Sequence, residues 1–67
     1  MKISARNQIA GKIVEIVKGA TTSHVGIDIG GKVITASITN ESVADMKLKV
    51  GEHATAIIKA SDVMVGV

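Results

Sequence analysis

The fold is decided by the stretch at residues 24–39, which reads HVGIDIGGKVITASIT. Apolar side chains occupy alternate positions on both sides of the central pair Gly30-Gly31, as in strands that bury one face. The predicted inward positions are Val25, Ile27, Ile29, Ile34, Ala36 and Ile38. A Gly-Gly pair between two alternating runs is a strong signal for a two-residue hairpin turn. The stretch therefore predicts two antiparallel strands, over 24–29 and 32–39.

The segment before this hairpin, residues 8–18, fits two patterns. Polar residues recur at every third position, at Lys12, Glu15 and Lys18, and this spacing suits one face of a helix. The composition favours a strand, because the segment is rich in β-branched Ile and Val and contains Gly11. A β-bulge shifts the alternation by one residue and would reconcile the two patterns. We therefore favour a long strand that is bent or bulged, followed by a polar turn over 18–23.

The segment after the hairpin contains one predicted helix, over 40–48. Asn40 is a residue type that often caps a helix N-terminus, and acidic residues come early in the segment while lysines come late. Val43 and Met46 would form the buried side of this helix.

The remaining residues predict two further strands, over 53–60 and 63–67, after a turn at 50–52. The order is then three strands, one helix and two strands, which is the order of an OB-type barrel. We expect an all-β fold with one short helix, arranged as a five-stranded OB-like barrel, in one domain over residues 1–67.

The composition excludes several classes of protein. The chain has 67 residues, no cysteine and no aromatic residue, so it has no disulfide framework, no thiolate metal site and no aromatic platform for nucleic-acid bases. His24 and His53 lie far apart in the sequence and form no metal-ligand motif. A chain this short buries little apolar surface on its own, so we expect a homo-oligomer. We expect no membrane segment, a cytoplasmic location and no enzyme activity, because no apolar run is long enough and no catalytic pattern is present.

Two short segments form the candidate site. The chain opens with Ser4-Ala5-Arg6-Asn7-Gln8, which offers a hydroxyl, a guanidinium and two carboxamides without any acid. Lys59-Ala60-Ser61 repeats the combination of cation, small residue and hydroxyl at the end of a predicted strand. Such donors suit a tetrahedral dianion, whereas hydrogen phosphate would also need an acceptor for its proton. The alternative for the opening segment is a solvated terminal strand.

These two segments, together with Gly11-Lys12-Ile13-Val14, Val50-Gly51 and the run Ala56 to Met64, closely resemble the molbindin (Mop) family of small molybdate-binding proteins. The resemblance covers essentially the whole chain and is closest to the free-standing storage form. It implies an OB-like barrel with strand exchange between subunits, and a hexamer built as a trimer of dimers. It also implies that the bound ligand is molybdate or tungstate, with no covalent cofactor.

The resemblance also implies which residues bind the anion. Ser4, Ala5 and Arg6 match the N-terminal binding segment of the family, and the C-terminal segment, contributed from a neighbouring subunit, matches Lys59, Ala60 and Ser61. A second site is implied at Gly19, Ala20 and Thr22. Two alternatives stay open, a nucleic-acid-binding OB module and a purely structural oligomerisation module.

Overall fold

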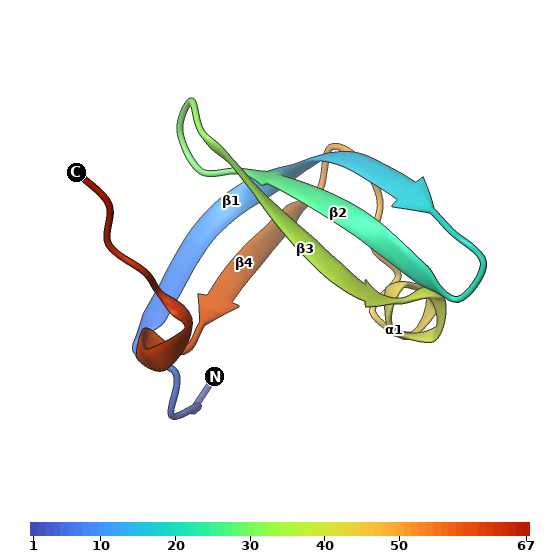
Figure 1. Ribbon diagram of the computed structural model, residues 1–67. Helices are drawn as coiled ribbons and strands as arrows, with labels where there is room; N and C mark the ends of the chain where they lie inside the picture. The colour runs from blue at the N-terminus through green and yellow to red at the C-terminus, as the bar shows by residue number, and fades with distance from the viewer.

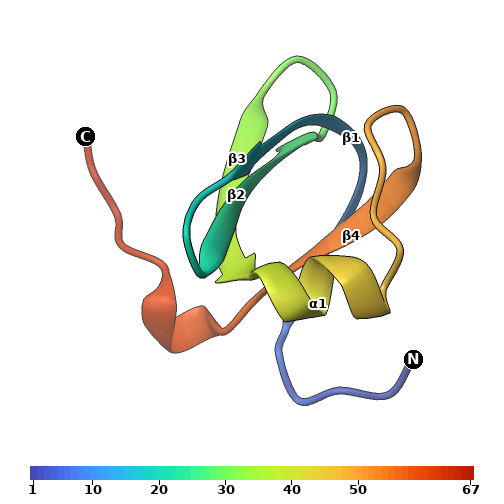
Figure 2. The same cartoon turned by 90° about the vertical axis from the view of Figure 1, so that its right-hand side faces the viewer.

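The computed structural model describes all residues 1–67 and shows one antiparallel sheet, curled around a small core (Figure 1). The elements in chain order are β1 (Asn7–Lys18), β2 (Thr22–Asp28), β3 (Val33–Thr39), α1 (Asn40–Asp45), β4 (His53–Ile58) and the 3-10 helix η1 (Ala60–Asp62). The four strands lie in the order β3-β2-β1-β4. Figure 2 looks into the curl and shows α1 lying across its lower opening. The expected class, mostly β with one short helix, is therefore confirmed.

The long strand β1 resolves the ambiguity of residues 8–18 in favour of a strand. It pairs with β2 on one side and with β4 on the other. Its register against β2 shifts between Ile13, which pairs with Ile27, and Glu15, which pairs with Gly26. The shift is the bulge that we expected, and it lets two isoleucines three positions apart, Ile13 and Ile16, face the same side of the sheet.

The hairpin at residues 24–39 forms as predicted. Both turn glycines have positive φ angles, +110° at Gly30 and +100° at Gly31, which side chains with a Cβ rarely adopt. The N–H of Ile29 donates to the carbonyl of Lys32 at 2.8 Å and closes the turn. β2 begins two residues earlier than predicted, because the ladder with β3 continues as far as the pair between Thr22 and Thr39.

The helix α1 is shorter than the predicted segment and begins with a different cap. Thr39, not Asn40, is the N-cap, since its hydroxyl oxygen accepts a hydrogen bond from the Ser42 N–H at 3.0 Å. The helix ends early because Lys47 adopts a left-handed backbone (φ +53°), which stops helical propagation. Val43 is half-buried as expected, but Met46 is exposed in the single chain.

The core lies on the concave side of the curled sheet. Its buried members are Ile13, Val25, Ile27 and Ala56, and half-buried apolar residues from β1, β3, β4, α1 and the flanking turns pack around them. Only 7 of the 67 residues are buried, which agrees with the expectation that so short a chain cannot bury much surface alone.

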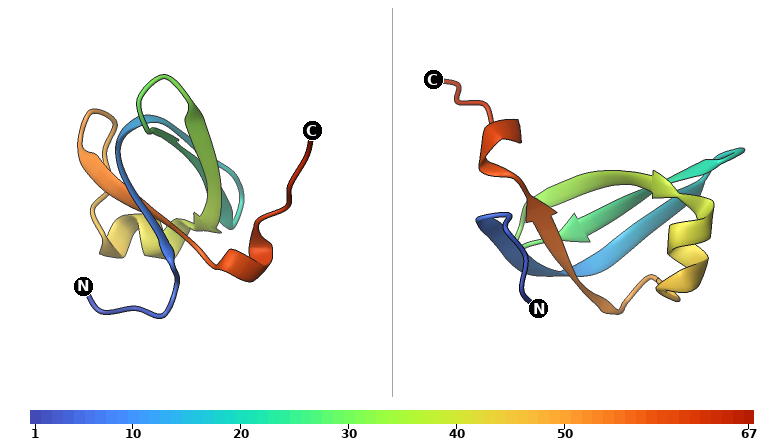
Figure 3. Two further views of the ribbon diagram at one scale, coloured as in Figure 1. Left: turned by 90° about the vertical axis from the view of Figure 1, so that its left-hand side faces the viewer. Right: turned by 90° about the horizontal axis from the view of Figure 1, so that it is seen from below.

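The C-terminal segment departs from the predicted architecture, because no fifth strand forms at residues 63–67. β4 ends at Ile58, η1 turns the chain, and the tail leads away from the sheet in every view (Figures 1, 2 and 3). Met64 and Val65 are consequently 93% and 91% exposed. The single chain therefore forms a four-stranded, incompletely closed sheet, and the tail has no strand partner.

Candidate functional site

The two predicted binding segments leave the sheet at the same end. The last pair of the β1–β4 ladder joins Asn7 and Ile58, so Arg6 and Lys59 are the first residues beyond it on the two strands. The start of β1 and the end of β4, followed by η1, lie together in Figures 1 and 3. The fold thus brings together segments that are more than fifty residues apart in the sequence.

Hydrogen-bond donors in these two segments have no partners within the chain. None of the backbone N–H groups of residues 4–6 and 59–61 donates a backbone hydrogen bond. The hydroxyls of Ser4 and Ser61, the Arg6 guanidinium and the Lys59 ammonium are likewise without hydrogen bonds. All of these residues except Ala5, which is 8% exposed, lie on the surface. A surface with many unpaired donors and two cations can hold an anion.

Two carbonyl oxygens in or directly beside these segments accept, in contrast, hydrogen bonds from side chains of β1. The Gln8 side-chain amide donates from Nε2 to the Ala5 carbonyl at 3.1 Å. The Asn7 amide donates from Nδ2 to the Ile58 carbonyl at 3.2 Å, directly before Lys59. These bonds tie the N-terminal segment to itself and to the end of β4.

Backbone groups of the short η1 turn occupy two further carbonyls. The N–H of Asp62 donates to the Lys59 carbonyl at 2.9 Å, and the N–H of Val63 donates to the Ala60 carbonyl at 3.2 Å. The candidate site therefore presents unpaired donors, while the carbonyls of Ala5, Lys59 and Ala60 each accept one hydrogen bond from the chain itself.

The part played by Asn7 and Gln8 did not follow from the sequence interpretation, which named them only as hydrogen-bonding side chains. The usable signal was their position, because a carboxamide directly after a binding segment can donate to carbonyls of that segment. The bond from Gln8 to Ala5 is local, whereas the bond from Asn7 to Ile58 depends on the pairing of β1 with β4, a contact between distant parts of the sequence.

Of the expected second site, Gly19 and Ala20 lie in the turn between β1 and β2 and Thr22 begins β2, at the opposite end of β1 from the first site. The Gly19 N–H donates to the Thr22 carbonyl at 2.7 Å and closes this turn. The side chain of Asn40 holds the turn from the helix, because its Nδ2 donates to the Gly19 carbonyl at 3.0 Å. The structure thus keeps the two candidate sites apart.

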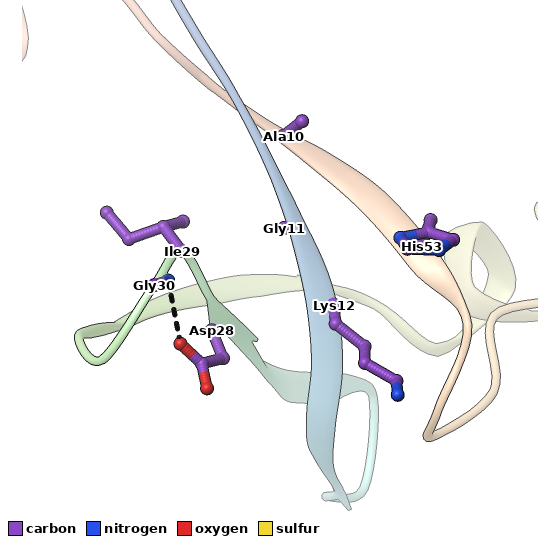
Figure 4. Close-up of a pocket in the computed structure, with 7 residues that line it drawn as sticks. All are labelled: Ala10, Gly11, Lys12, Asp28, Ile29, Gly30 and His53. Atoms are coloured by element: carbon purple, nitrogen blue, oxygen red, sulfur yellow. Dashed lines mark hydrogen bonds between the residues drawn. The ribbon is translucent and has the colours of Figure 1, made fainter.

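A shallow hollow of about 370 Å³ near the β2–β3 hairpin contains none of the predicted site residues (Figure 4). Lys12 and His53 line it, but so does the Asp28 carboxylate, which accepts hydrogen bonds from the N–H groups of Gly30 and Gly31 at 2.9 Å. The bond from Gly31, followed by that from Gly30, lowers the pKa of Asp28. A carboxylate that is ionised at neutral pH at its edge makes this hollow unsuitable for an anion.

Two other features bear on function. The structure contains no cluster of three or more His, Cys, Asp or Glu side chains that could hold a metal ion. None of its helices has both the length and the apolar character needed to cross a bilayer.

Comparison with known proteins identifies the family. The model of the TOBE domain family matches residues 3–65. A "Probable molybdenum-pterin-binding protein" of Haemophilus influenzae is 52% identical over 68 residues, which cover 100% of this chain and 99% of the relative.

Solved structures agree with this match. MopII from Clostridium pasteurianum superposes with a TM-score of 0.92 at 43% identity, over 98% of this chain and 100% of that one. ModG, described as a cytoplasmic molybdate-binding protein and solved with molybdate bound, gives a TM-score of 0.95 at 43% identity, over all of this chain and 48% of its own. The chain therefore belongs to the molbindin (Mop) proteins of the TOBE domain family.

Proposed function

We propose that this protein binds molybdate at sites formed between subunits of a homo-oligomer. Each site would combine the N-terminal segment of one subunit with the C-terminal segment of a neighbour. The residues of the site are Ser4, Ala5, Arg6, Lys59, Ala60 and Ser61.

The observation that carries this proposal is the excess of unpaired donors in the two segments. Molybdate is a fully deprotonated tetrahedral dianion near neutral pH, so it needs donors only. Each hydrogen bond to a charged group contributes about 1.5–3 kcal/mol, and micromolar affinity requires about 8 kcal/mol. Four to six such bonds would supply this after desolvation and ordering, whereas Arg6 alone would not.

The likeness to ModG, whose structure contains molybdate, supports the same ligand. Tungstate should bind as well, because the two oxyanions are nearly equal in size. We propose a non-catalytic role in molybdate storage and homeostasis, in the cytoplasm, with residues 1–67 acting as one binding domain.

Surface properties of the single chain support oligomer formation. An apolar cavity of about 510 Å³ lies open within the curled sheet, lined by residues of β2, β3 and β4 and by Met46 and Leu48 after the helix. The exposed tail carries Val63, Met64 and Val65, whose side chains are apolar like the lining of this cavity. We propose that the tail of a second copy occupies the cavity and adds the fifth strand by exchange, within a hexamer built as a trimer of dimers.

A second site is proposed at the β1–β2 turn, with Gly19, Ala20 and Thr22. Support comes from the hydrogen bonds that hold this turn rigidly between β1 and α1, which would present its remaining backbone N–H groups in a fixed arrangement.

Isothermal titration with molybdate tests the function, with sulfate as the competing dianion. We expect saturable molybdate binding, and a melting temperature that rises with bound molybdate because the anion bridges subunits. Arg6→Ala should lose most of the affinity, whereas Lys32→Ala, which removes an exposed cation in the β2–β3 hairpin turn, should not.

Two outcomes would contradict the proposal. Equal losses from Arg6→Ala and Lys32→Ala would mean that binding is diffuse electrostatic attraction rather than a site. Absence of any saturable binding would leave the structural oligomerisation module as the better account of the two segments.

A further inference from the structure

We infer that Gln8 is a positioning residue of the oxyanion site, which fixes the direction of the Arg6 backbone N–H before an anion binds. The side-chain amide of Gln8 donates from Nε2 to the Ala5 carbonyl at 3.1 Å. That carbonyl and the Arg6 N–H belong to the same peptide unit. The inference rests on the proposed function and adds to it a residue that acts through the backbone rather than by touching the ligand.

The planarity of the peptide bond transmits the effect of this hydrogen bond. In a planar trans peptide the C=O and N–H groups point in opposite directions, and the chain contains no cis peptide bond. A hydrogen bond to the Ala5 carbonyl therefore sets the direction in which the Arg6 N–H points. That N–H donates to no group of the chain, so it is available to an anion.

The bond from Gln8 is the only hydrogen bond that reaches residues 1–6. These residues precede β1, and no backbone hydrogen bond and no other side-chain hydrogen bond involves them. Ala5 is also buried, at 8% exposed. A buried methyl group restrains the position of the chain, whereas a hydrogen bond to the carbonyl restrains the rotation of the peptide unit itself. The rotation of the unit between Ala5 and Arg6 therefore depends on Gln8.

The C-terminal segment fixes its peptide units in a different way. The carbonyls of Lys59 and Ala60 accept hydrogen bonds from backbone N–H groups of η1 and of the residue after it, and no side-chain substitution removes these bonds. The N–H groups of the same two peptide units are free, as the N–H of Arg6 is. Gln8 thus supplies with a side chain, in the N-terminal segment, what backbone bonds supply in the C-terminal one.

A donor that is fixed before binding strengthens binding, because the anion does not have to order the peptide unit itself. The gain cannot exceed the strength of the hydrogen bond that orders the donor. A neutral hydrogen bond in a protein corresponds to a factor of about 2 to 13 in an equilibrium constant. Loss of the Gln8 amide should therefore weaken molybdate binding by about 2- to 13-fold.

Two measurements on Gln8→Met test the inference. Met is similar in length to Gln but has no hydrogen-bond donor. Isothermal titration with molybdate should show the affinity lowered by about 2- to 13-fold. Nuclear magnetic resonance relaxation on the anion-free protein should show a lower order parameter for the Arg6 amide than in the wild-type protein, while the amides of residues 59–61 keep theirs.

Lys12→Met is the matched control, because it also places Met at an exposed position of β1. Lys12 lies about 20 Å along the strand from Arg6, where an exposed charge is largely screened at physiological salt. The control should change neither the molybdate affinity nor the Arg6 order parameter. Melting temperature and size-exclusion chromatography check that each variant folds and assembles, and Gln8→Leu takes the place of Gln8→Met if that variant does not.

The outcomes separate this inference from the proposed function. A wild-type protein that does not bind molybdate overturns both. If the wild-type protein binds molybdate and Gln8→Met binds it equally well, the proposed function stands and the inference is overturned. The inference is also overturned if the affinity falls while the Arg6 amide of the anion-free variant stays as rigid as in the wild-type protein, because Gln8 would then act on the anion directly.

Discussion

Replacing Lys47 with glycine should stabilise this protein. Lys47 follows the last turn of α1 and holds a left-handed backbone, with φ at +53°. Its N–H donates to the Ala44 carbonyl and the N–H of Leu48 donates to the Val43 carbonyl, both at 3.1 Å. This pair of bonds is the Schellman arrangement, in which the left-handed position is most often glycine.

The size of the effect follows from two opposing contributions. A left-handed backbone costs a residue with a Cβ about 1–2 kcal/mol, and glycine avoids this cost. Glycine also gives the unfolded chain more conformational freedom, which opposes folding by about 0.5–1 kcal/mol. The net gain is about 0–1.5 kcal/mol, and its central value of about 0.75 kcal/mol raises the melting temperature of a chain of this length by about 3–6 °C.

Thermal unfolding followed by circular dichroism, at one fixed protein concentration, measures this gain. Lys47→Ala removes the same charge but keeps a Cβ, so it should show no increase. Lys49→Gly places glycine in a nearby exposed position without a positive φ, and it should melt at or below the wild-type temperature. The reasoning is refuted if Lys47→Gly melts no higher than Lys47→Ala.

Two further predictions concern buried or bonded polar groups. Because the pKa of Asp28 is lowered, the stability that its carboxylate provides is present above the usual pKa of about 3.9 and is lost as the pH falls through the lowered folded value. Acid unfolding monitored below about pH 4 should therefore depend less steeply on pH in Asp28→Asn, and an unchanged slope would contradict this assignment. The hydroxyl of Ser23, which is 2% exposed, donates to Oδ1 of Asn40. Urea unfolding should show that Asn40→Ala loses about 1–3 kcal/mol by leaving this hydroxyl unpaired, and that Asn40→Asp, which keeps the acceptor, loses less.

Features set by neighbouring residues were predictable from the sequence. The alternation around Gly30-Gly31 predicted the hairpin, and the conflict between spacing and composition in residues 8–18 predicted a bulged strand. In both cases the pattern of apolar side chains specifies which face of a strand is buried, and burial is the main energetic preference at those positions.

Features set by competition between distant groups were not predictable in the same way. Asn40 has a good N-cap side chain, but that side chain is bonded to Gly19 and Ser23, and Thr39 caps the helix instead. The segment at 63–67 has the composition of a strand, yet a strand also needs a neighbour, and the single chain provides none after η1.

In the candidate site, too, the chemical types of the residues were predictable from the sequence, whereas their arrangement in space was not. The chemical types in Ser4-Ala5-Arg6 and Lys59-Ala60-Ser61 pointed to an anion without any structure. That the two segments leave the sheet side by side depends on the register between Asn7 and Ile58, and the hydrogen bond from the Asn7 amide to the Ile58 carbonyl depends on the same register.

The bulge in β1 divides the strand into two parts, and odd-numbered residues face the core in the first part while even-numbered residues face it in the second. Before it, odd-numbered residues such as Ile9 and Ile13 face the core, and after it the even-numbered Ile16 does. One residue could therefore be deleted at Val14 or Glu15 without exchanging inside for outside anywhere along the strand. A deletion elsewhere in β1 would invert the faces between it and the bulge. We expect length variation within β1 to be tolerated at these two positions alone, at the cost of the bend that curls the sheet.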